Sequence, residues 1–221
     1  MWMRVVRSPG LTSAAMNRTI EAYEESDLPA ISAAPGCMGL VFGENHVAGS
    51  LCTVAFWESL EAIDASRGLA ETARDRAEQA AENIYEPIFD QYEVTFQRGL
   101  DVIVDTDAGE YSAFRFVRFE GLDDEGLDRT AEAYRNQDLE AIEATPGFAG
   151  LVLGVNREEG RLVTVSFWIS RDTMRASEES FLASQGRSVA VAEASQAGAL
   201  VDRFDIRLTT KLDGLRESAA S

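Results

Sequence analysis

PGCMGLVFGENHVAGSLCTVAFWES, residues 35–59, decides the fold because this stretch occurs twice in the chain. The second copy is PGFAGLVLGVNREEGRLVTVSFWIS, residues 146–170, and each matching position lies 111 residues further on. A repeat of this length at a fixed offset indicates a duplicated structural unit. The chain of 221 residues is long enough for two units of about 100 residues each.

Each copy predicts the same order of elements, namely strand, helix, hairpin, helix and strand, which is the βαββαβ order of a ferredoxin-like unit. In the first copy, a helix is expected over residues 14–34, begun by Thr12 or Ser13 and kinked or ended at Pro29. A second helix is expected from the cap at Ser59 to about residue 81. The hairpin strand between them has two apolar faces, which indicates cover on both sides.

The sequence therefore predicts an α+β fold with two tandem ferredoxin-like units packed sheet to sheet around a barrel-like core. Two helices cover only one face of a four-stranded sheet, so the other face would be a large exposed apolar patch without a partner. A second unit in the same chain supplies that partner at high effective concentration. The expected boundaries are residues 1–97 for the first unit, 98–110 for a linker, 111–210 for the second unit and 211–221 for a flexible tail.

The composition excludes several classes of partner. The formal net charge is −18, which argues against nucleic acid and against anionic membranes, because both require a basic surface. No apolar run approaches the ~20 residues of a membrane span, and the N-terminus lacks the apolar core of a signal peptide. We therefore expect an acidic, soluble, cytoplasmic protein with no nucleic-acid partner and no membrane.

The sequence gives little support for a metal site or for a catalytic nucleophile. His46 is the single histidine and is expected in an exposed turn. With Cys37 and Cys52 it cannot form a four-ligand structural zinc site, so no metal is predicted. Phosphate-binding glycine motifs and the HExxH motif are absent as well. No residue is singled out as catalytic.

Three residue types recur at matching positions and form the candidate substrate-binding set. An arginine on a covered strand requires either a carboxylate of the protein or an acidic or quinone-like ligand, and both alternatives stay open. The aromatic residues either pack in the core or line a pocket. Two further arginines near the strand ends, Arg7 and Arg118, are expected to be solvated. The candidate set is Arg4 and Arg115, Trp57 and Trp168, and Tyr23 and Tyr134.

The pattern Pro-Gly-Phe-x-Gly, a hairpin, and Phe-Trp-x-Ser opening a helix resembles the antibiotic biosynthesis monooxygenase-like (ABM) domains of the dimeric α+β barrel superfamily. The resemblance covers nearly all of both copies. It implies a pseudo-dimer within one chain, with scope for a further homo-oligomer, and a small-molecule ligand. Members of this family include cofactor-independent quinol monooxygenases, haem-degrading oxygenases and many proteins of unknown activity.

Three functions follow from this resemblance. The first is a cofactor-independent monooxygenase, an oxidoreductase acting on a small aromatic or quinone-like substrate that is positioned by the arginines and tryptophans of the candidate set. The second is a non-catalytic small-molecule-binding or stress-related module on the same fold. The third is haem binding or degradation, for which the resemblance implies a first-strand asparagine and a second-helix histidine. Arg4 and Arg115 stand at the first position and neither second helix has a histidine, so no cofactor, haem included, is expected.

Overall fold

The computed structural model describes residues 1–80, 87–99, 113–178, 181–182 and 199–210. The predicted tail, and residues 100–110 of the predicted linker, lie outside the described residues. Contacts divide the chain into two compact units, Met1–Gln91 with the chain from Ile206 onward (unit 1) and Tyr92–Asp205 (unit 2). Each unit is described by itself below.

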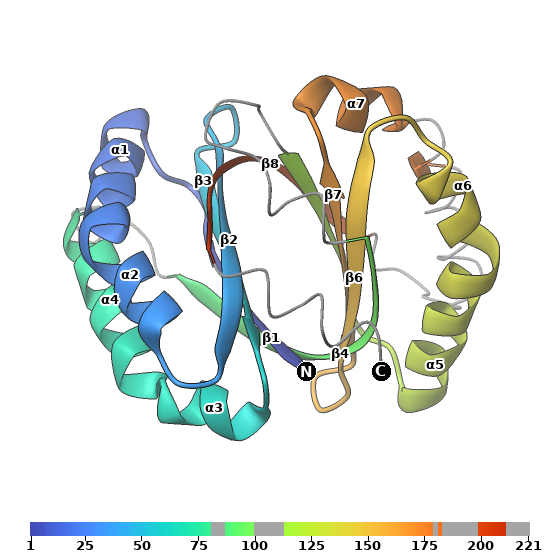
Figure 1. Ribbon diagram of the computed structural model, residues 1–221, viewed down its shortest axis with the longest axis horizontal. Coiled ribbons are helices and arrows are strands. Elements are labelled where there is room, and N and C mark those ends of the chain that lie inside the picture. Colours follow the sequence, from blue (N-terminus) through green and yellow to red (C-terminus); the bar gives the residue numbers. More distant parts are fainter. Residues whose placement is uncertain (81–86, 100–112, 179–180, 183–198, 211–221) are drawn as a thin grey trace. The chain divides into compact units, whose positions relative to one another are not determined.

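Unit 1 is a sheet covered by helices on one face. Strand β3 lies between β1 and β2 and pairs antiparallel with both. Figure 1 shows helices α1, α2 and α4 on one side of β2 and β3. The elements are β1 (Trp2–Ser8), α1 (Ser13–Ala22), the π-helix η1 (Tyr23–Asp27), α2 (Leu28–Ala33), β2 (Cys37–Asn45), β3 (Ser50–Trp57), α3 (Leu60–Ala65) and α4 (Arg67–Ala80).

Unit 2 repeats this order, and the register of its strands repeats as well. In β1 and β3, Arg4 lies opposite Ala55, and in β5 and β7, Arg115 lies opposite Ser166, which are the positions 111 residues further on. The α+β ferredoxin-like order of elements is thus confirmed, whereas sheet-to-sheet packing stays a prediction. The elements are β5 (Ala113–Phe119), α5 (Asp124–Ala133), the π-helix η3 (Tyr134–Asp138), α6 (Leu139–Glu143), β6 (Phe148–Asn156), β7 (Arg161–Trp168) and α7 (Arg171–Ala176).

Strands β4 (Ile88–Arg98) and β8 (Leu200–Thr210) each run through the boundary between the two contact-defined units. Residues 93–98 of β4 pair antiparallel with β6, and residues 200–205 of β8 pair with β5, so the sheet of unit 2 has the order β8-β5-β7-β6-β4. The sequence pattern predicts both strands but not the β4–β6 pairing. The alternation of side chains indicates which face of a strand is buried, but it does not specify which other strand pairs with it.

The long first helix contains a π-helical turn rather than a kink at Pro29. In η1 the Leu28 N–H bonds to the Tyr23 carbonyl, and Pro29 lies in the first turn of α2. The same turn occurs at η3, where Glu140 replaces the proline, so proline is not its cause. Such turns are frequent at functional sites, and both of these begin with a tyrosine of the candidate set.

The second helix is broken where the sequence predicts continuity. Ser59 caps α3 as expected, since its side chain accepts a hydrogen bond from the Ala62 N–H at 3.2 Å. The chain then turns at Ser66, whose Oγ donates to the Ile63 carbonyl at 2.7 Å, before α4 begins. All eight residues of β3 are buried, which confirms the prediction that both faces of this strand are covered.

Gly49 provides a stability test because its backbone has φ +62° and a Cβ there would lie 2.2 Å from the Leu11 carbonyl oxygen. The Leu11 N–H also donates to the Gly49 carbonyl at 2.7 Å, so neither segment can move away freely. We expect Gly49→Ala to cost more than the about 1–2 kcal/mol of a left-handed residue alone. Gly10→Ala is the matched control, with φ +78° and nothing within 4 Å. If urea unfolding shows equal losses of unfolding free energy for Gly49→Ala and Gly10→Ala, the predicted steric contribution at Gly49 is contradicted.

Asp27 makes stability depend on pH. It is buried and accepts a hydrogen bond from Arg76 at 2.6 Å. Burial raises the pKa of Asp27 above its ordinary 3.8, and Arg76 offsets part of that rise. The unfolded chain then ionises at lower pH, so this residue's contribution to stability is lost as pH rises through the folded-state pKa. We expect Asp27→Asn to gain stability relative to the wild type across that window. A difference in unfolding free energy that does not vary with pH would contradict this.

Candidate functional site

The Arg4 side chain of unit 1 is buried on the helix-covered face of the sheet. Its Nη2 donates a hydrogen bond to the Ile63 carbonyl of α3 at 2.7 Å. Its guanidinium carbon lies 5.4 Å from the centroid of the Trp57 ring, within cation–π range. β1 and β3 hold Arg4 and Trp57 in neighbouring strands, and α3 closes over the guanidinium. The buried Arg4 guanidinium is therefore in contact with the Trp57 ring.

Arg4 has no ion pair with any carboxylate among the described residues. Burial lowers the pKa of Arg4, the Asp64 carboxylate opposes this shift, and the Arg67 charge adds to it. Asp64 itself is hydrogen-bonded to Arg67 at 3.1 Å. An unpaired buried cation is costly, so the site favours an added negative group.

A small apolar cavity lies beside Arg4. The space open to the centre of a water molecule is about 20 Å³, which is room for roughly one water. Tyr23, the first residue of η1, lines the cavity and stacks on Phe42 with ring centroids 5.5 Å apart. Phe89 of β4 also lines it and is 39% exposed, so this residue contacts both the cavity and solvent. The lining is Arg4, Val6, Tyr23, Ile31, Thr53, Ala55, Trp57, Ala70, Ala73 and Phe89.

The corresponding arginine of unit 2, Arg115, is bound by side chains of its own unit. Its Nη2 donates to the Met174 carbonyl at 2.8 Å, to Ser177 Oγ at 2.9 Å and to Glu178 Oε2 at 3.2 Å. The Phe181 ring centroid lies 4.1 Å from its guanidinium carbon. Burial lowers the pKa of Arg115 to about 10, and Glu178 opposes the shift. An internal ion pair is thus formed in unit 2.

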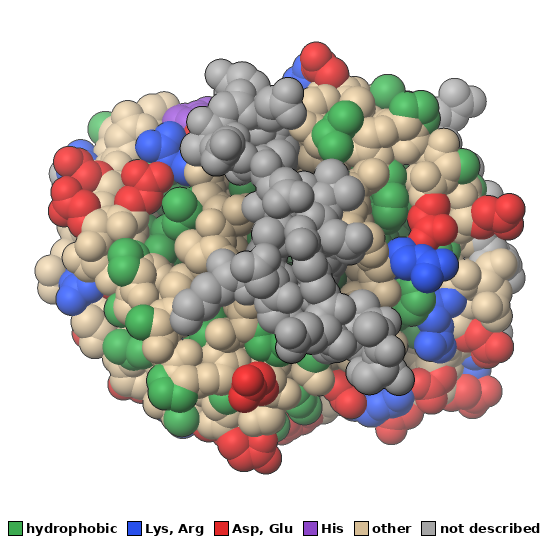
Figure 2. All heavy atoms as spheres, viewed as in Figure 1, with side chains coloured by type: hydrophobic (Ala, Val, Ile, Leu, Met, Phe, Trp, Pro, Cys, Tyr) green, Lys and Arg blue, Asp and Glu red, His purple; other side chains and the backbone are tan. Residues whose placement is uncertain are grey.

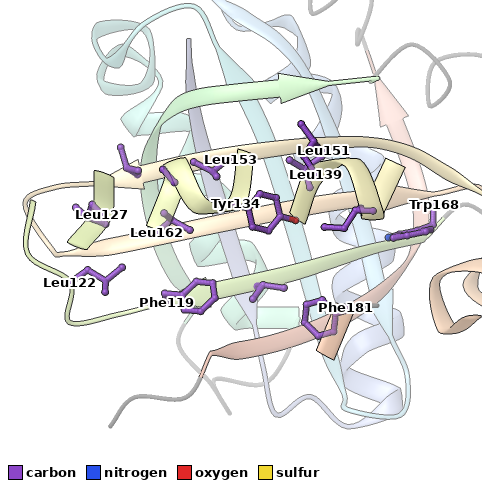
Figure 3. Close-up of a cluster of buried hydrophobic side chains, with 14 of the residues drawn as sticks. Phe119, Leu122, Leu127, Tyr134, Leu139, Leu151, Leu153, Leu162, Trp168 and Phe181 are labelled. Carbon is purple, nitrogen blue, oxygen red and sulfur yellow. The ribbon is translucent and has the colours of Figure 1, made fainter. Parts of the chain in front are cut away.

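The aromatic residues of unit 2 belong to its core. Figure 3 shows Tyr134, Trp168 and Phe181 among the leucines between the sheet and its helices. Burial raises the pKa of Tyr134, and a hydrogen bond with Thr164 works against this rise. The Tyr134 hydroxyl therefore stays protonated at neutral pH and cannot act as a base.

The structure brings the six candidate residues together in two sets of three, one per unit, and leaves their role in binding a prediction. Each set combines a tyrosine, a tryptophan and a buried arginine: Arg4, Tyr23 and Trp57 in unit 1, and Arg115, Tyr134 and Trp168 in unit 2. Sequence reasoning missed Phe89, Glu178 and Phe181. Comparison of positions 111 residues apart offered a signal for the last two, because Glu178 and Phe181 align with Arg67 and Ala70.

The expectation that Arg7 and Arg118 are solvated is wrong. Arg7 is buried, and its Nη2 lies 3.5 Å from Oδ2 of the buried Asp90. The Arg118 side chain is 12% exposed and pairs with Glu120 at 2.8 Å. Both lie in strands covered on two sides, so a position near the strand end does not bring solvent.

A second hollow of unit 1, about 370 Å³, is polar and open, and its lining includes Glu21, Glu24, Glu44, His46 and Arg207. His46 is half exposed, as expected for a turn, and its Nε2 lies 3.3 Å from Glu44 Oε1. Figure 2 shows Asp and Glu side chains predominating over Lys and Arg on the visible face. Within the described ranges, no group of His, Cys, Asp and Glu side chains is arranged to hold a metal ion. Nor does any described helix have the length and apolar character to span a membrane.

Comparisons with known sequences give two relatives and no matching family model. "Uncharacterized protein MT2634" and "Uncharacterized protein Rv2557", from two strains of Mycobacterium tuberculosis, are each 24% identical over 180 residues. The match covers 80% of this chain and 77% of each relative.

Solved structures extend the comparison to the fold. An anthrone oxidase-like protein superimposes with a TM-score of 0.71 at 17% identity, covering 96% of this chain and 93% of that one. A Listeria monocytogenes ferredoxin-fold protein related to antibiotic biosynthesis monooxygenases gives 0.51 at 13% identity, over 92% and 94%. LmHde, a heme-degrading enzyme from Listeria monocytogenes, gives 0.52 at 12% identity, over 91% and 98%. The chain therefore has the α+β ferredoxin-like fold of the ABM-like proteins.

Proposed function

We propose that this protein is an ABM-like oxidoreductase that binds a small aromatic or quinone-like substrate in unit 1 and oxidises it with molecular oxygen. The observation that carries the proposal is the buried Arg4, which rests against Trp57 beside an apolar cavity and has no ion pair among the described residues. Such a site binds an anion with an aromatic body better than either a neutral molecule or an aliphatic anion.

The cavity lining limits the chemistry. It contains no carboxylate and no histidine, so the chain offers no obvious general base at this place. The substrate must then be acidic enough to lose its proton to water, as phenols and activated C–H compounds are. The Arg4 guanidinium stabilises the resulting anion and lowers the pKa of the bound substrate.

Oxygen completes a balanced reaction. The electron-rich substrate anion transfers electrons to O₂, and two hydrogens leave the substrate in total. One oxygen atom enters the product as a carbonyl, and the other leaves as water. The name of one structural neighbour, anthrone oxidase-like, is compatible with a substrate of this acidity.

Haem does not fit the same cavity. The lining has no histidine, cysteine or methionine, and Tyr23 is the one residue there whose side-chain oxygen resembles a known haem ligand. A space of about 20 Å³ also cannot receive a porphyrin without large movement. We therefore derive no step through haem.

The test is oxygen consumption by chelator-treated protein with a panel of hydroquinone, naphthohydroquinone and anthrone. We expect uptake with at least one compound and a product heavier by one oxygen and lighter by two hydrogens. Tight binding of a panel member without oxygen uptake would instead support the non-catalytic binding module, which the absence of a base in the lining favours. A Soret band in the purified protein would contradict the proposal in favour of haem.

We also infer that the two units pack sheet to sheet as a pseudo-dimer within one chain. The strand register repeated between the units supports this inference, since it gives each unit the same sheet face. Native mass spectrometry tests the further assembly. A mass of 24.1 kDa is expected if the pseudo-dimer is complete in itself.

A further inference from the structure

We infer that the two matching pockets have diverged, so that unit 1 binds one aryl carboxylate per chain while unit 2 is filled by side chains that imitate this ligand. The inference rests on the proposed function in placing the ligand beside Arg4. It adds the ligand class, the stoichiometry and the reason why only one pocket works.

Arg4 and Arg115 share the same backbone frame, which consists of a helix carbonyl that accepts from the arginine and a serine that donates to that carbonyl. Arg4 donates to the Ile63 carbonyl and Arg115 to the Met174 carbonyl, at positions related by the offset of 111. Ser66 donates to the Ile63 carbonyl at 2.7 Å, and Ser177 to the Met174 carbonyl at 2.6 Å. With this frame shared, the sites differ in the residues that follow the turn, and on the sheet in Ala55 and Ser166.

Two side chains fill the site in unit 2. Glu178 places a carboxylate oxygen 3.2 Å from Arg115 Nη2, and Phe181 places its ring centroid 4.1 Å from the guanidinium carbon. Phe181 is buried in the core cluster of unit 2. Together they present to one guanidinium a carboxylate and a phenyl ring, the two parts of an aryl carboxylate.

Both parts are missing in unit 1. Arg67 stands at the position of Glu178, and Ala70 at the position of Phe181. The Arg67 side chain is 71% exposed and pairs with Asp64, whereas Ala70 lines the cavity. Arg4 and Arg67 carry two positive charges against one at Asp64. This part of a chain with net charge −18 therefore favours an anion.

Entry of the ligand requires the cavity to widen, and Phe89 is the side chain that we expect to move. The present space holds about one water, and Phe89 in its lining is 39% exposed, so its ring has room to turn out into solvent. With one inserted residue allowed for, unit 2 has the smaller Val201 at this place. The large aromatic residue is thus Phe89, on the partly exposed strand β4, in unit 1. In unit 2 it is Phe181, in the core. If Phe89 rotates outward, the ring of the ligand can take the position beside Arg4 that Phe181 takes beside Arg115.

The experiment transplants the filling side chains in both directions, with salicylate as the probe in titration calorimetry. Wild-type protein is expected to bind one salicylate per chain, and the neutral salicylamide at least tenfold more weakly. Arg67→Glu with Ala70→Phe should reduce salicylate affinity at least tenfold. Glu178→Ala with Phe181→Ala should raise the stoichiometry from one to two.

The alternative outcomes are distinguishable. Two equal sites in the wild type, no site at all, or affinity unchanged by Arg67→Glu with Ala70→Phe would overturn the inference. Thermal unfolding checks that each variant is folded, and Ala70→Phe alone, which also narrows the cavity, replaces the double variant if that one unfolds. One salicylate per chain without oxygen uptake by the panel would refute the proposed function and leave the inference standing. Oxygen uptake by the panel together with two salicylates bound per wild-type chain would refute the inference alone.

Discussion

Trp168→Ala is expected to lower the free energy of unfolding by about 3–5 kcal/mol, the range for truncating a fully buried large aromatic residue. Trp168 is 1% exposed, meets Phe148 edge to face at 5.7 Å and donates from Nε1 to Ser166 Oγ at 3.1 Å. Truncation therefore opens a cavity and also removes a buried hydrogen bond.

Trp57→Ala is expected to cost less than Trp168→Ala, towards the lower end of that range. Trp57 is fully buried but already borders a cavity, and its Nε1 has no hydrogen-bond partner among the described residues. Trp2→Ala, at a half-buried position, serves as the control and should cost the least. Urea unfolding measures all three. Equal costs at Trp57 and Trp168 would contradict the claim that only the pocket of unit 2 is filled.

Arg4→Met is expected to weaken salicylate binding roughly 10- to 100-fold, because charge-assisted hydrogen bonds contribute about 1.5–3 kcal/mol. The same change should leave stability unchanged or increase it, since the buried Arg4 charge has no ion pair among the described residues. The Ile63 carbonyl keeps its hydrogen bond from Ser66. A residue that is needed for binding and is neutral or costly for folding is the expected mark of a functional site.

Arg115→Met should give the opposite pattern. It removes three hydrogen bonds, to Met174, Ser177 and Glu178, so stability should fall while salicylate affinity stays at the wild-type value. Calorimetric titration and urea unfolding of both variants measure the contrast. Loss of affinity in Arg115→Met, or a marked loss of stability in Arg4→Met, would contradict the assignment of unit 1 as the binding unit.

The repeat at residues 35–59 and 146–170 was enough to predict the ferredoxin-like order of elements and the burial of Arg4 and Arg115. These features follow from period, caps and alternation, which are local properties of a sequence. The π-helical turns at Tyr23 and Tyr134 were not predictable in this way, because both helices keep an ordinary apolar spacing. The pairing of β4 with β6 was also missed, because a strand's side chains do not specify its neighbour.

The candidate site was predictable only in part. A buried arginine requires a negative partner, but sequence alone could not decide between a side chain and a ligand. The decision depends on the turn after α3 and α7, where Arg67 and Ala70 replace Glu178 and Phe181. Arg7 shows the same limit, because its partner Asp90 lies 83 positions away in the sequence.

Anomalous diffraction from crystals grown with 5-bromosalicylate tests the central claim most directly, since bromine locates the ligand without an assumed pose. We predict one bromine site per chain, in the cavity of unit 1, with the ligand carboxylate on the Arg4 guanidinium and Phe89 rotated outward. Bromine beside Arg115, bromine in both units, or an Arg4 guanidinium without ligand in crystals that hold bromine elsewhere would contradict the account.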